Sequence, residues 1–445
     1  MIAGELAKVL RGELRGDPQA RVEGFSIDSR QVGEGDVFFA LKGERHDGHD
    51  FVTDAVDRGA VGCVVERDVE HAGRFSIKVS STQEALRELA LYRRGLFRGE
   101  VVGVAGSVGK TTTKELIHHL LSNAATSFRS EGNLNSQIGL PLVVCNMPLE
   151  VDYAVLELGA SAVGDVEKLV EVAQPKVRVI TALGEEHLES FGTLEDVVKG
   201  NGEIFRGFTE DSRAVIPHYA LEYYDLPRER VTTFGEGGDL NAGKVRLSLK
   251  GTEFEFWGER FSVPLLSRGV VQNVLAAFGV LTSLGYDPRD FREALKSFTP
   301  PQGRMNLLNF GNFFVVDDTY NANPPSVRNA LTTLASLQTS SKRVAVLGDM
   351  LELGVESGRY HAEVGKLGAE LGIDVIIFHG EESKRSYEEC IKHGGNALFC
   401  DKKEDIVDEL LKYMRDKNII LVKGSRGMRM EWVVEKMGEL VEYGA

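Results

Sequence analysis

Short apolar runs alternate with amphipathic segments along most of this 445-residue chain. Residues 101–105, 153–156 and 177–183 are apolar runs of strand length, and each leads into a polar or glycine-rich segment. Residues 114–121 carry apolar pairs one helical turn apart, which indicates an amphipathic helix. This alternation predicts an α/β fold with a mostly parallel sheet, whose chemistry lies at the carboxyl ends of the strands.

The N-terminal residues 1–97 show the same alternation on a smaller scale. The runs at 36–41 and 62–65 predict strands, and the segments 51–59 and 82–97 predict helices. We therefore expect a small N-terminal α/β domain ahead of the central one.

A second series of buried strands follows the Pro-Pro-Gln-Gly turn at residues 300–303, which is a natural domain boundary. We expect a central parallel-sheet domain at 98–298 that resembles an ATPase, and a C-terminal Rossmann-like domain at 299–445. Within the central domain, residues 244–263 alternate apolar and polar positions, as in an antiparallel hairpin, and 273–284 predict a helix. The strands expected in the C-terminal domain are residues 313–316, 343–347, 374–378 and 419–422.

Composition narrows the partners and the location. A net charge of −15 at pH 7, without a long Lys/Arg block, argues against a nucleic-acid binder. It does not argue against an anionic substrate, because local cations decide binding at a site. No apolar run approaches membrane-spanning length, and Met1 to Glu5 begin an amphipathic helix rather than a signal peptide. We expect a cytoplasmic protein without membrane insertion. Its widely spaced cysteines are expected to be reduced and structural: Cys63, Cys145, Cys390 and Cys400.

The most informative local motif is a phosphate loop between an expected strand and an expected helix. It is the run Gly106-Ser107-Val108-Gly109-Lys110-Thr111-Thr112-Thr113. Backbone N–H groups and the helix dipole would face an anion, Lys110 would reach the phosphates, and the Thr111 hydroxyl would bind Mg²⁺. The fuller motif has a glycine where Val104 stands, so a glycine turn that only packs a helix on a strand is the alternative. The context favours a nucleoside triphosphate site.

Three further residues stand where strands or domains end. Glu157 ends an apolar run, where an acid in phosphate-loop enzymes holds Mg²⁺; a solvated strand-end side chain is the alternative. His187 follows the next run and is a candidate ligand of a second Mg²⁺ or an orienter of the acceptor, although a lone histidine is usually structural. Arg304 follows the domain boundary and could swing onto a phosphate, or lie on the surface of a hinge.

Two polar turns mark strand ends in the C-terminal domain. The run Asp317-Asp318-Thr319-Tyr320-Asn321-Ala322-Asn323-Pro324-Pro325 is costly to bury unless it binds something. Asn323 before Pro324 also fits a helix cap, and both interpretations can hold together. The run Lys423-Gly424-Ser425-Arg426-Gly427 suits a carboxylate or a phosphate. In the N-terminal domain, His46 and His49 lack further ligands at metal-binding spacing.

Taken in order along nearly the whole chain, these motifs resemble those of the Mur ligases of peptidoglycan synthesis. No single motif decides, and the joint order is what is specific. Besides the runs above, the resemblance rests on Asp28-Ser29-Arg30, Lys42 to Phe51, Gly132-Asn133-Leu134-Asn135, Ile138 to Pro141, Glu157-Leu158-Gly159, His187-Leu188-Glu189, Gly303-Arg304-Met305 and Leu347 to Gly354.

The resemblance implies three domains and an activity. The runs 317–324 and 348–354 are typical of the family member that joins D-alanyl-D-alanine to UDP-N-acetylmuramoyl-tripeptide. The first domain would hold the UDP-sugar, the second would hold ATP with two Mg²⁺ ions, and the third would close over both. The tripeptide carboxylate would attack the γ-phosphate of ATP to give an acyl phosphate. The dipeptide amine would then form the amide and release phosphate, while domain closure excludes water.

The resemblance also assigns roles by position. Lys110, His187 and Arg304 would be catalytic. ATP would contact the phosphate loop from Gly106 to Thr112, and also Asn273, Arg304 and Asp318. Mg²⁺ would be held by Thr111, Glu157 and His187. The residues implied in substrate binding are Ser29, Arg30, Lys42, Asp47, His49, Asn133, Asn135, Asn321, Asn323, Lys423, Ser425 and Arg426.

Two positions depart from the family pattern. The family has a lysine, carbamylated to serve the second Mg²⁺, where this chain has Asn201, and Lys199 is out of register. Asparagine cannot form a carbamate, so our hypothesis is a second Mg²⁺ held more weakly, or through Asn201 and water. A strong bicarbonate dependence of activity would count against it. The family's His-Asn pair appears as Gly269-Val270, which puts a strict adenine preference in doubt, although Asn273 is kept.

Three alternatives stay open from the sequence. They are a sibling Mur or folylpolyglutamate-type ligase, a phosphate-loop kinase, and a non-catalytic nucleotide-binding regulator. The loop at 321–324 and the first domain speak against the siblings. Retention of the phosphate loop, Glu157, His187 and Arg304 speaks against a regulator, although Asn201 keeps it open. A monomer is the default expectation, and the third residue of the tripeptide is not specified.

Overall fold

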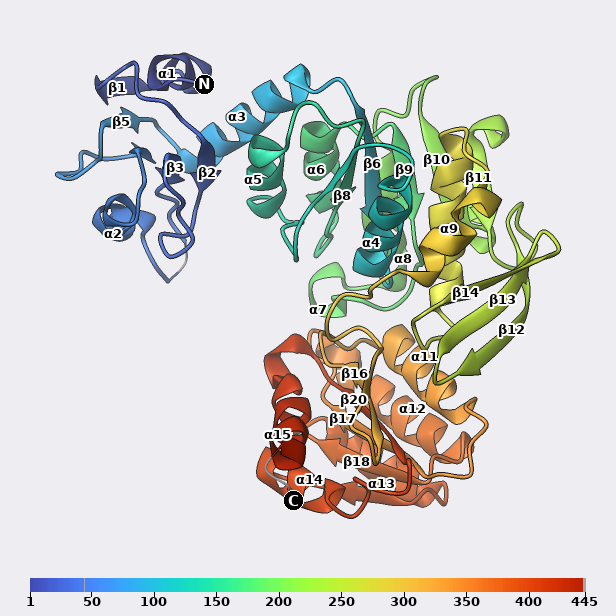
Figure 1. Ribbon diagram of the computed structural model, residues 1–445. Coiled ribbons are helices and arrows are strands. Elements are labelled where there is room, and N and C mark those ends of the chain that lie inside the picture. Colours follow the sequence, from blue (N-terminus) through green and yellow to red (C-terminus); the bar gives the residue numbers. More distant parts are fainter. Residues whose placement is uncertain (44, 443–445) are drawn as a thin grey trace. The chain divides into compact units, whose positions relative to one another are not determined.

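The computed structural model describes residues 1–43 and 45–442 (Figure 1). Glu44, within the run from Lys42 to Phe51, lies outside this described part. The chain divides into two compact units. The first comprises residues 1–103, 125–159 and 165–176, and the second comprises 104–124, 160–164 and the chain from 177 onward.

The first unit begins with a small α/β layer. Its helices are α1 (Ala3–Leu10), α2 (Val52–Asp57) and α3 (Thr82–Leu96), and its strands are β1 (Glu13–Gly16), β2 (Gly24–Ser26), β3 (Asp36–Phe39), β4 (Gly62–Val65) and β5 (Phe75–Lys78). The strands form a sheet of order β1-β5-β4-β3-β2. Strand β1 is antiparallel to β5, and the other neighbours are parallel. Buried Phe38, Cys63 and Val65 pack on Val52 and Ala55 of α2, which explains the apolar runs.

The rest of the first unit carries part of the central sheet. It contains strands β7 (Ser127–Arg129) and β8 (Tyr153–Glu157) and helices α5 (Gly139–Asn146) and α6 (Asp165–Ala173). Strands β7 and β8 are parallel, and α5 packs on α3 and α6. Strand β6 (Glu100–Ala105) continues from this unit into the second.

The second unit contains the remaining strands of the central sheet. They are β9 (Val177–Ile180), β10 (Arg213–Pro217) and β11 (Val231–Phe234), and the helices around them are α4 (Lys110–Leu121), α7 (Leu188–Phe191), α8 (Leu194–Gly202), α9 (Val270–Ser283) and α10 (Arg292–Lys296). Within this unit the strands are ordered β11-β10-β9. Strand β10 is parallel to β9 and to β11. The predicted helix at 273–284 begins three residues earlier, at Val270.

The antiparallel pairing predicted at 244–263 is present, but the segment forms a three-stranded antiparallel sheet and not a single hairpin. Its strands are β12 (Ala242–Ser248), β13 (Gly251–Phe256) and β14 (Glu259–Val263). Phe254, Phe256 and Phe261 alternate onto one face and are almost fully buried. Two of these rings, Phe256 and Phe261, also contact Phe278 of α9, which fixes the register of the sheet by its apolar face.

The C-terminal part is a second layered α/β structure. Its strands are β15 (Asn306–Asn309), β16 (Phe314–Asp318), β17 (Arg343–Gly348), β18 (Val375–His379), β19 (Ala397–Phe399) and β20 (Ile419–Lys423), and its helices are α11 (Pro324–Ala335), α12 (Ser357–Glu370), α13 (Ser383–Lys392), α14 (Lys403–Leu410) and α15 (Glu431–Glu442). The strand order is β15-β16-β20-β17-β18-β19, with only β15 antiparallel. Helices α14 and α15 share one core with the sheet, and α11, α12 and α13 pack together (Figure 1).

The α/β class with parallel sheets is therefore confirmed, and each strand predicted from an apolar run is present. The predicted strand at 177–183 is too long, since β9 ends at Ile180. The boundaries 97/98 and 298/299 stay predictions. Within residues 1–43 and 45–442, no helix has the length and apolar character needed to cross a bilayer.

The four cysteines are free and buried. Burial raises the pKa of the Cys63 thiol to about 12, and it also raises the pKa of the Cys145, Cys390 and Cys400 thiols. Because the thiolate is the nucleophile, we expect none of the four to react with the disulfide reagent DTNB in the folded protein. All four should react in guanidinium chloride. A thiol that reacts before unfolding would contradict a purely structural role.

Candidate functional site

The phosphate loop lies between β6 and α4, as the sequence predicts. Gly106 and Gly109 have φ values of 130° and 88°, which residues with a Cβ rarely adopt. A Cβ on Gly106 would lie 2.3 Å from Thr181 Oγ1, and one on Gly109 would lie 2.4 Å from Asn273 Oδ1. Helix α4 begins at Lys110, so its unpaired N–H groups and positive dipole end point toward the loop. The arrangement suits an anion.

The segment that follows β9 holds this loop. Thr181 Oγ1 donates to the Val108 carbonyl at 2.7 Å, and the Ser107 amide donates to the Ala182 carbonyl at 2.7 Å. The Gly184 amide in turn donates to Ser107 Oγ at 3.1 Å. These bonds take the chain out of the sheet after β9, which is why the strand is shorter than its apolar run.

Asn201 on α8 ties three segments together. Its Oδ1 accepts a hydrogen bond from the Gly106 amide at 2.8 Å. Its Nδ2 donates to Glu186 Oε1 at 3.0 Å and to the Val197 carbonyl at 3.1 Å. The side chain has no exposed surface. The hypothesis that Asn201 binds a metal stays untested, but in this structure its carbonyl oxygen already serves the phosphate loop.

Lys110 is paired with a buried carboxylate. Its Nζ lies 3.0 Å from Glu186 Oε2 and also donates to the Gly106 carbonyl. The Glu186 side chain is 4% exposed and that of Lys110 is 15% exposed. A carboxylate this buried needs a cationic partner, and Lys110 supplies it.

Arg304 lies at the phosphate loop, and its predicted contact with a phosphate stays untested. Its Nη2 donates to Thr111 Oγ1 at 2.8 Å. Its guanidinium lies 3.9 Å from the centre of the Tyr320 ring, in cation–π contact. The Asn306 side chain accepts from the Arg304 amide at 2.9 Å. The arginine is therefore positioned by stacking and by its backbone, with its charge beside the Thr111 hydroxyl.

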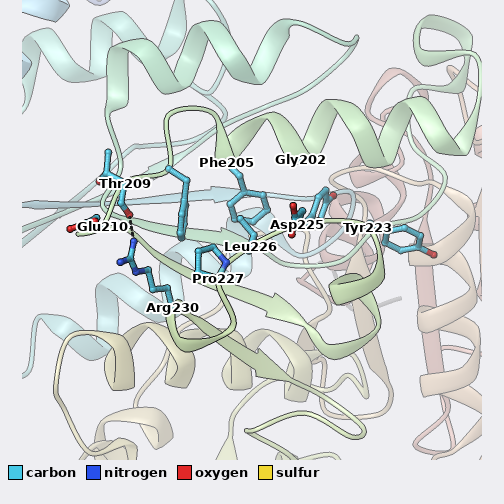
Figure 2. Close-up of a pocket in the computed structure, with 11 residues that line it drawn as sticks. Gly202, Phe205, Thr209, Glu210, Tyr223, Asp225, Leu226, Pro227 and Arg230 are labelled. Atoms are coloured by element: carbon cyan, nitrogen blue, oxygen red, sulfur yellow. Dashed lines mark hydrogen bonds between the residues drawn. The ribbon is translucent and has the colours of Figure 1, made fainter.

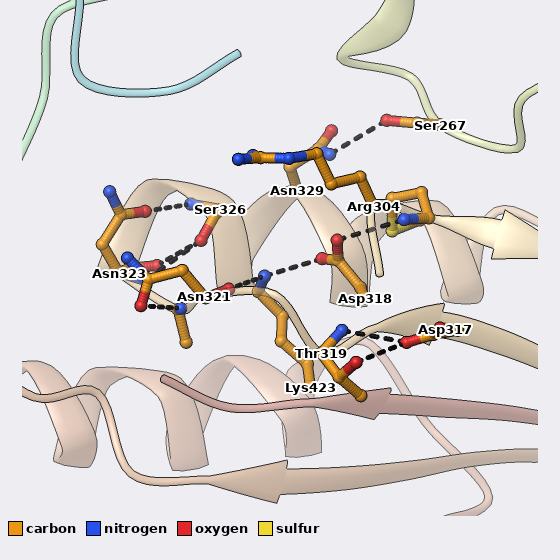
Figure 3. A network of polar contacts seen from close by, with 12 residues as sticks. Ser267, Arg304, Asp317, Asp318, Thr319, Asn321, Asn323, Ser326, Asn329 and Lys423 are labelled. Carbon is orange, nitrogen blue, oxygen red and sulfur yellow. Dashed lines mark hydrogen bonds and ion pairs between the residues drawn. The ribbon is translucent and has the colours of Figure 1, made fainter. Parts of the chain in front are cut away.

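An ion pair joins the ends of β16 and β20 (Figure 3). Lys423 Nζ lies 2.6 Å from Asp318 Oδ2 and donates to the Asn321 carbonyl at 2.8 Å. The Met305 amide donates to Asp318 Oδ1 at 3.1 Å. Burial raises the pKa of the Asp318 carboxyl, while Lys423 and Arg304 act in the opposite direction. Asp318 and Lys423 are thus partners of one another, and their predicted ligand contacts stay untested.

The neighbouring polar loops are fixed by their own hydrogen bonds. Asn323 caps α11, and its Oδ1 accepts from the Ser326 amide at 3.0 Å in a capping box, so the capping interpretation is confirmed. Asn321 Oδ1 accepts from the Arg426 amide at 3.3 Å. Ser425 Oγ donates to the Ala322 carbonyl at 3.1 Å. The Arg426 guanidinium is exposed, and its Nη1 lies 3.4 Å from Glu431 Oε1.

His187 has a left-handed backbone conformation, with φ of 45°. Its Nδ1 lies 2.6 Å from Glu352 Oε2, and the Glu189 amide donates to the Glu352 carbonyl at 3.0 Å. The contact fixes the imidazole against the loop that follows β17. Its role as a metal ligand stays a prediction.

In the first unit, Glu157 ends β8 and is 3% exposed. Asn135 Nδ2 donates to Glu157 Oε1 at 2.8 Å, and the Glu157 amide donates to Ser130 Oγ at 3.1 Å. The backbone of Asn133 accepts from the Asn135 amide at 2.8 Å. Two of the predicted residues, Glu157 and Asn135, are thus direct neighbours.

The residues predicted to bind substrate in the N-terminal domain are Ser29, Arg30, Lys42, Asp47 and His49. His49 Nδ1 lies 2.6 Å from Asp47 Oδ1, and His49 Nε2 accepts from the Glu66 amide at 2.8 Å. Both ring nitrogens of His49 are occupied, so it positions its loop. Lys42 forms an isolated β-bridge with Asp47, and Ser29 is buried. The Arg30 side chain is 80% exposed and bonds both carboxylate oxygens of Asp28.

A cavity of about 600 Å³ lies beside α8 in the second unit (Figure 2). Tyr224 Oη donates to the Val198 carbonyl of α8 at 2.9 Å, and Arg230 donates to the Thr209 carbonyl at 3.2 Å. Sequence reasoning did not find it. Its lining residues are Gly202, Phe205, Phe208, Thr209, Glu210, Tyr223, Tyr224, Asp225, Leu226, Pro227 and Arg230.

Sequence reasoning also missed residues that contact the predicted ones. They are Thr181, Glu186, Tyr320 and Glu352. Glu186 carried a usable signal, since it directly precedes His187 in the polar segment that follows β9. Among the described residues, no three His, Cys, Asp or Glu side chains are grouped so as to hold a metal ion by themselves.

The fold and this site define a phosphate-loop nucleotide-binding protein with an arginine from its C-terminal part at the loop. Three family models match the chain. They are the Mur ligase family catalytic domain at residues 21–94, the Mur ligase middle domain at 104–281, and the Mur ligase glutamate ligase domain at 303–426. These three matches, together with similarity to known Mur ligases over almost the whole chain, show that the chain belongs to the Mur ligase family.

Similar proteins extend over almost the whole chain. The UDP-N-acetylmuramoyl-tripeptide–D-alanyl-D-alanine ligase of Bacillus subtilis strain 168 is 32% identical, over 98% of this chain and 97% of that protein. A MurF crystal structure from Acinetobacter baumannii has a TM-score of 0.89 at 31% identity, over 98% of both chains. The MurF ligase from Thermotoga maritima in complex with ADP has a TM-score of 0.83 at 33% identity, over 96% of this chain and 99% of that one.

Replacement of Asn201 by alanine should weaken nucleotide binding. The change removes the acceptor of the buried Gly106 amide and the donor to Glu186 Oε1. Each buried polar group left without a partner costs about 1–3 kcal/mol of free energy. We expect the affinity for a fluorescent ATP analogue to fall about ten- to a hundredfold, with a lower thermal midpoint. Asn123→Ala is the control, because the side chain of that exposed asparagine donates to the His119 carbonyl of its own helix end and not to the phosphate loop. Equal affinities of the two variants would contradict the anchoring role.

Proposed function

We propose that this chain is an ATP-dependent amide ligase that joins D-alanyl-D-alanine to UDP-N-acetylmuramoyl-tripeptide. The proteins that resemble it over nearly its full length carry that activity in their names. The structural observation that carries the proposal is the contact of Arg304 with Thr111 at the phosphate loop, 2.8 Å long. It brings a fixed positive charge from the C-terminal part to the place where a triphosphate would be activated.

The chemistry fits these charges. A carboxylate is a poor electrophile, so the tripeptide carboxylate first attacks the γ-phosphorus of ATP, and ADP leaves. The acyl phosphate then has a good leaving group. The amine of D-alanyl-D-alanine attacks its carbonyl carbon, loses a proton, and the tetrahedral intermediate expels inorganic phosphate. Two anions must meet in the first step, and Lys110 and Arg304 would offset their repulsion.

The site roles form part of this proposal. Lys110 and the loop amides would bind the β- and γ-phosphates, with Asn273 and Asp318 among the ATP contacts. Mg²⁺ would supply further charge neutralisation, and Thr111, Glu157 and His187 are the residues we assign to it. Hydroxyl and carboxylate oxygens are ligands that Mg²⁺ prefers. The N-terminal residues Ser29 to His49 would hold the UDP end. The dipeptide and peptide would lie near Asn321, Asn323 and the loop from Lys423 to Arg426.

The cellular setting is also proposed. We expect the protein to act in the cytoplasm, where ATP and the UDP-linked precursor are available, and to act as a monomer. Light scattering of the pure protein tests the oligomeric state, and a mass near 48.9 kDa is expected.

Product analysis tests the reaction class. With ATP, Mg²⁺, UDP-N-acetylmuramoyl-tripeptide and D-alanyl-D-alanine, we expect one ADP and one phosphate for each amide formed. With hydroxylamine in place of the dipeptide, the acyl phosphate should be trapped as a hydroxamate. A phosphate-loop kinase would give a phosphorylated substrate and no hydroxamate. Absence of both ADP and amide product would overturn the proposal.

Replacement of Arg304 by alanine should lower kcat by about 10²- to 10³-fold, the range seen when one preorganised group at a developing charge is removed. The KM for ATP should change less. The control is Arg246→Ala, which removes an exposed arginine of β12. Steady-state ADP release with saturating substrates measures the effect. Parallel losses in the two variants would argue against a specific role of Arg304.

A further inference from the structure

The phosphate-loop lysine is bound inside the protein. Lys110 Nζ lies 3.0 Å from Glu186 Oε2 and donates to the Gly106 carbonyl of its own loop. In a phosphate loop the same ammonium group contacts the β- and γ-phosphates of the nucleotide. The Glu186 carboxylate and a triphosphate are therefore two anions that use one lysine.

Glu186 is held where it is by more than Lys110. Its other oxygen, Oε1, accepts from Asn201 Nδ2 at 3.0 Å, and Asn201 is itself fixed by the Gly106 amide. The carboxylate is 4% exposed, so solvent does little to stabilise its charge. When Lys110 turns to the phosphates, Glu186 keeps its position and loses its cation.

A nucleotide makes this imbalance worse, because it brings several negative charges to the loop that Glu186 adjoins. A buried carboxylate next to phosphate oxygens is stable only with a cation between them. Mg²⁺ is such a cation, since it binds one or two carboxylates together with phosphate oxygens and retained waters.

We propose that Glu186 is a ligand, directly or through one water, of a Mg²⁺ ion that enters with the nucleotide. In that complex Mg²⁺ takes the place of Lys110 at Glu186, and Lys110 contacts the phosphates. The proposal rests on the proposed use of ATP. Its structural basis is the chain of contacts from Gly106 through Asn201 and Glu186 to Lys110.

Neighbouring Asn201 carries this role less well. Asn201 has no charge, and its oxygen already accepts from the Gly106 amide. His187 keeps the role assigned to it above, since its Nδ1 lies 2.6 Å from Glu352 Oε2 and a metal would use Nε2; Glu186 would act beside it. Among the described residues no three His, Cys, Asp or Glu side chains are grouped to hold a metal ion, so in this proposal phosphate oxygens of the nucleotide complete the coordination. The ion should therefore bind together with the nucleotide and not before it.

Manganese(II) binding tests the proposal without turnover. Mn²⁺ replaces Mg²⁺ at oxygen sites, and its free concentration is measured by electron paramagnetic resonance. For the wild type we expect tight Mn²⁺ binding with a non-hydrolysable ATP analogue, and much weaker binding without it. In Glu186→Gln we expect the affinity for Mn²⁺ in the analogue complex to fall at least tenfold.

A second measurement separates a ligand from a structural residue. With EDTA present, Glu186→Gln should bind the metal-free analogue as tightly as the wild type or several-fold more tightly, because Lys110 is released and a negative charge is gone. A structural defect would instead weaken binding with and without metal to the same extent, and that result would overturn the proposal. Unchanged Mn²⁺ affinity in Glu186→Gln would overturn it as well.

Two further variants complete the design. Glu195→Gln removes an exposed carboxylate at the start of α8 and should leave both affinities at the wild-type level. Glu186→Asp keeps the charge one methylene shorter, so its Mn²⁺ affinity should lie between those of the wild type and Glu186→Gln. If Glu186→Gln does not fold, Glu186→Asp provides the test. The proposal would be overturned if Glu186→Asp kept full Mn²⁺ affinity, or if its affinities for Mn²⁺ and for the metal-free analogue fell by the same factor.

The outcomes also separate this proposal from the proposed function. A wild-type protein that binds no ATP analogue would overturn both. A wild type that forms the amide, together with a Glu186→Gln variant of normal Mn²⁺ affinity, would overturn only the role of Glu186.

Discussion

The amide group of Asn201 is the interaction on which the nucleotide end of this structure depends. A primary amide accepts and donates at once, and Asn201 uses both functions: Oδ1 accepts from Gly106, and Nδ2 donates to Glu186 and to Val197. The side chain is completely buried, so water does not replace a lost partner. The amide therefore fixes the first turn of the phosphate loop and the carboxylate beside Lys110 at the same time.

Two ion pairs balance charges in the second unit, and each joins one segment of the chain to another. Lys110 faces Glu186, and Lys423 faces Asp318 at the ends of two neighbouring strands. Arg304 differs, because its guanidinium donates to the Thr111 hydroxyl and lies over the Tyr320 ring. A guanidinium that is placed by stacking keeps its charge for a phosphate, whereas a lysine that is already paired has to exchange one partner for another.

The sequence predicted the fold class and the places where chemistry lies, since both depend on local pattern. Buried strands appear as apolar runs, and in parallel sheets the polar residues at their carboxyl ends gather at one edge. Gly106 to Thr113, Glu157, Asp318 and Lys423 were found in this way. The contact between Gly106 and Asn201 joins residues 95 positions apart, and no periodic pattern in the sequence predicts it. The early end of β9 has the same origin, because hydrogen bonds to the phosphate loop, and not hydrophobicity, decide where that strand stops.

The residue types at positions 186 and 201 depend on each other through charge and hydrogen bonding. A lysine at 201 could donate to Glu186 but could not accept from the Gly106 amide, and it would compete with Lys110 for the one carboxylate. An aspartate at 201 could accept from Gly106 but would repel Glu186 at hydrogen-bond distance in a buried place. The neutral asparagine accepts on one side, donates on the other and adds no charge. It therefore leaves the full charge of Glu186 to whichever cation is present, which is Lys110 in this structure.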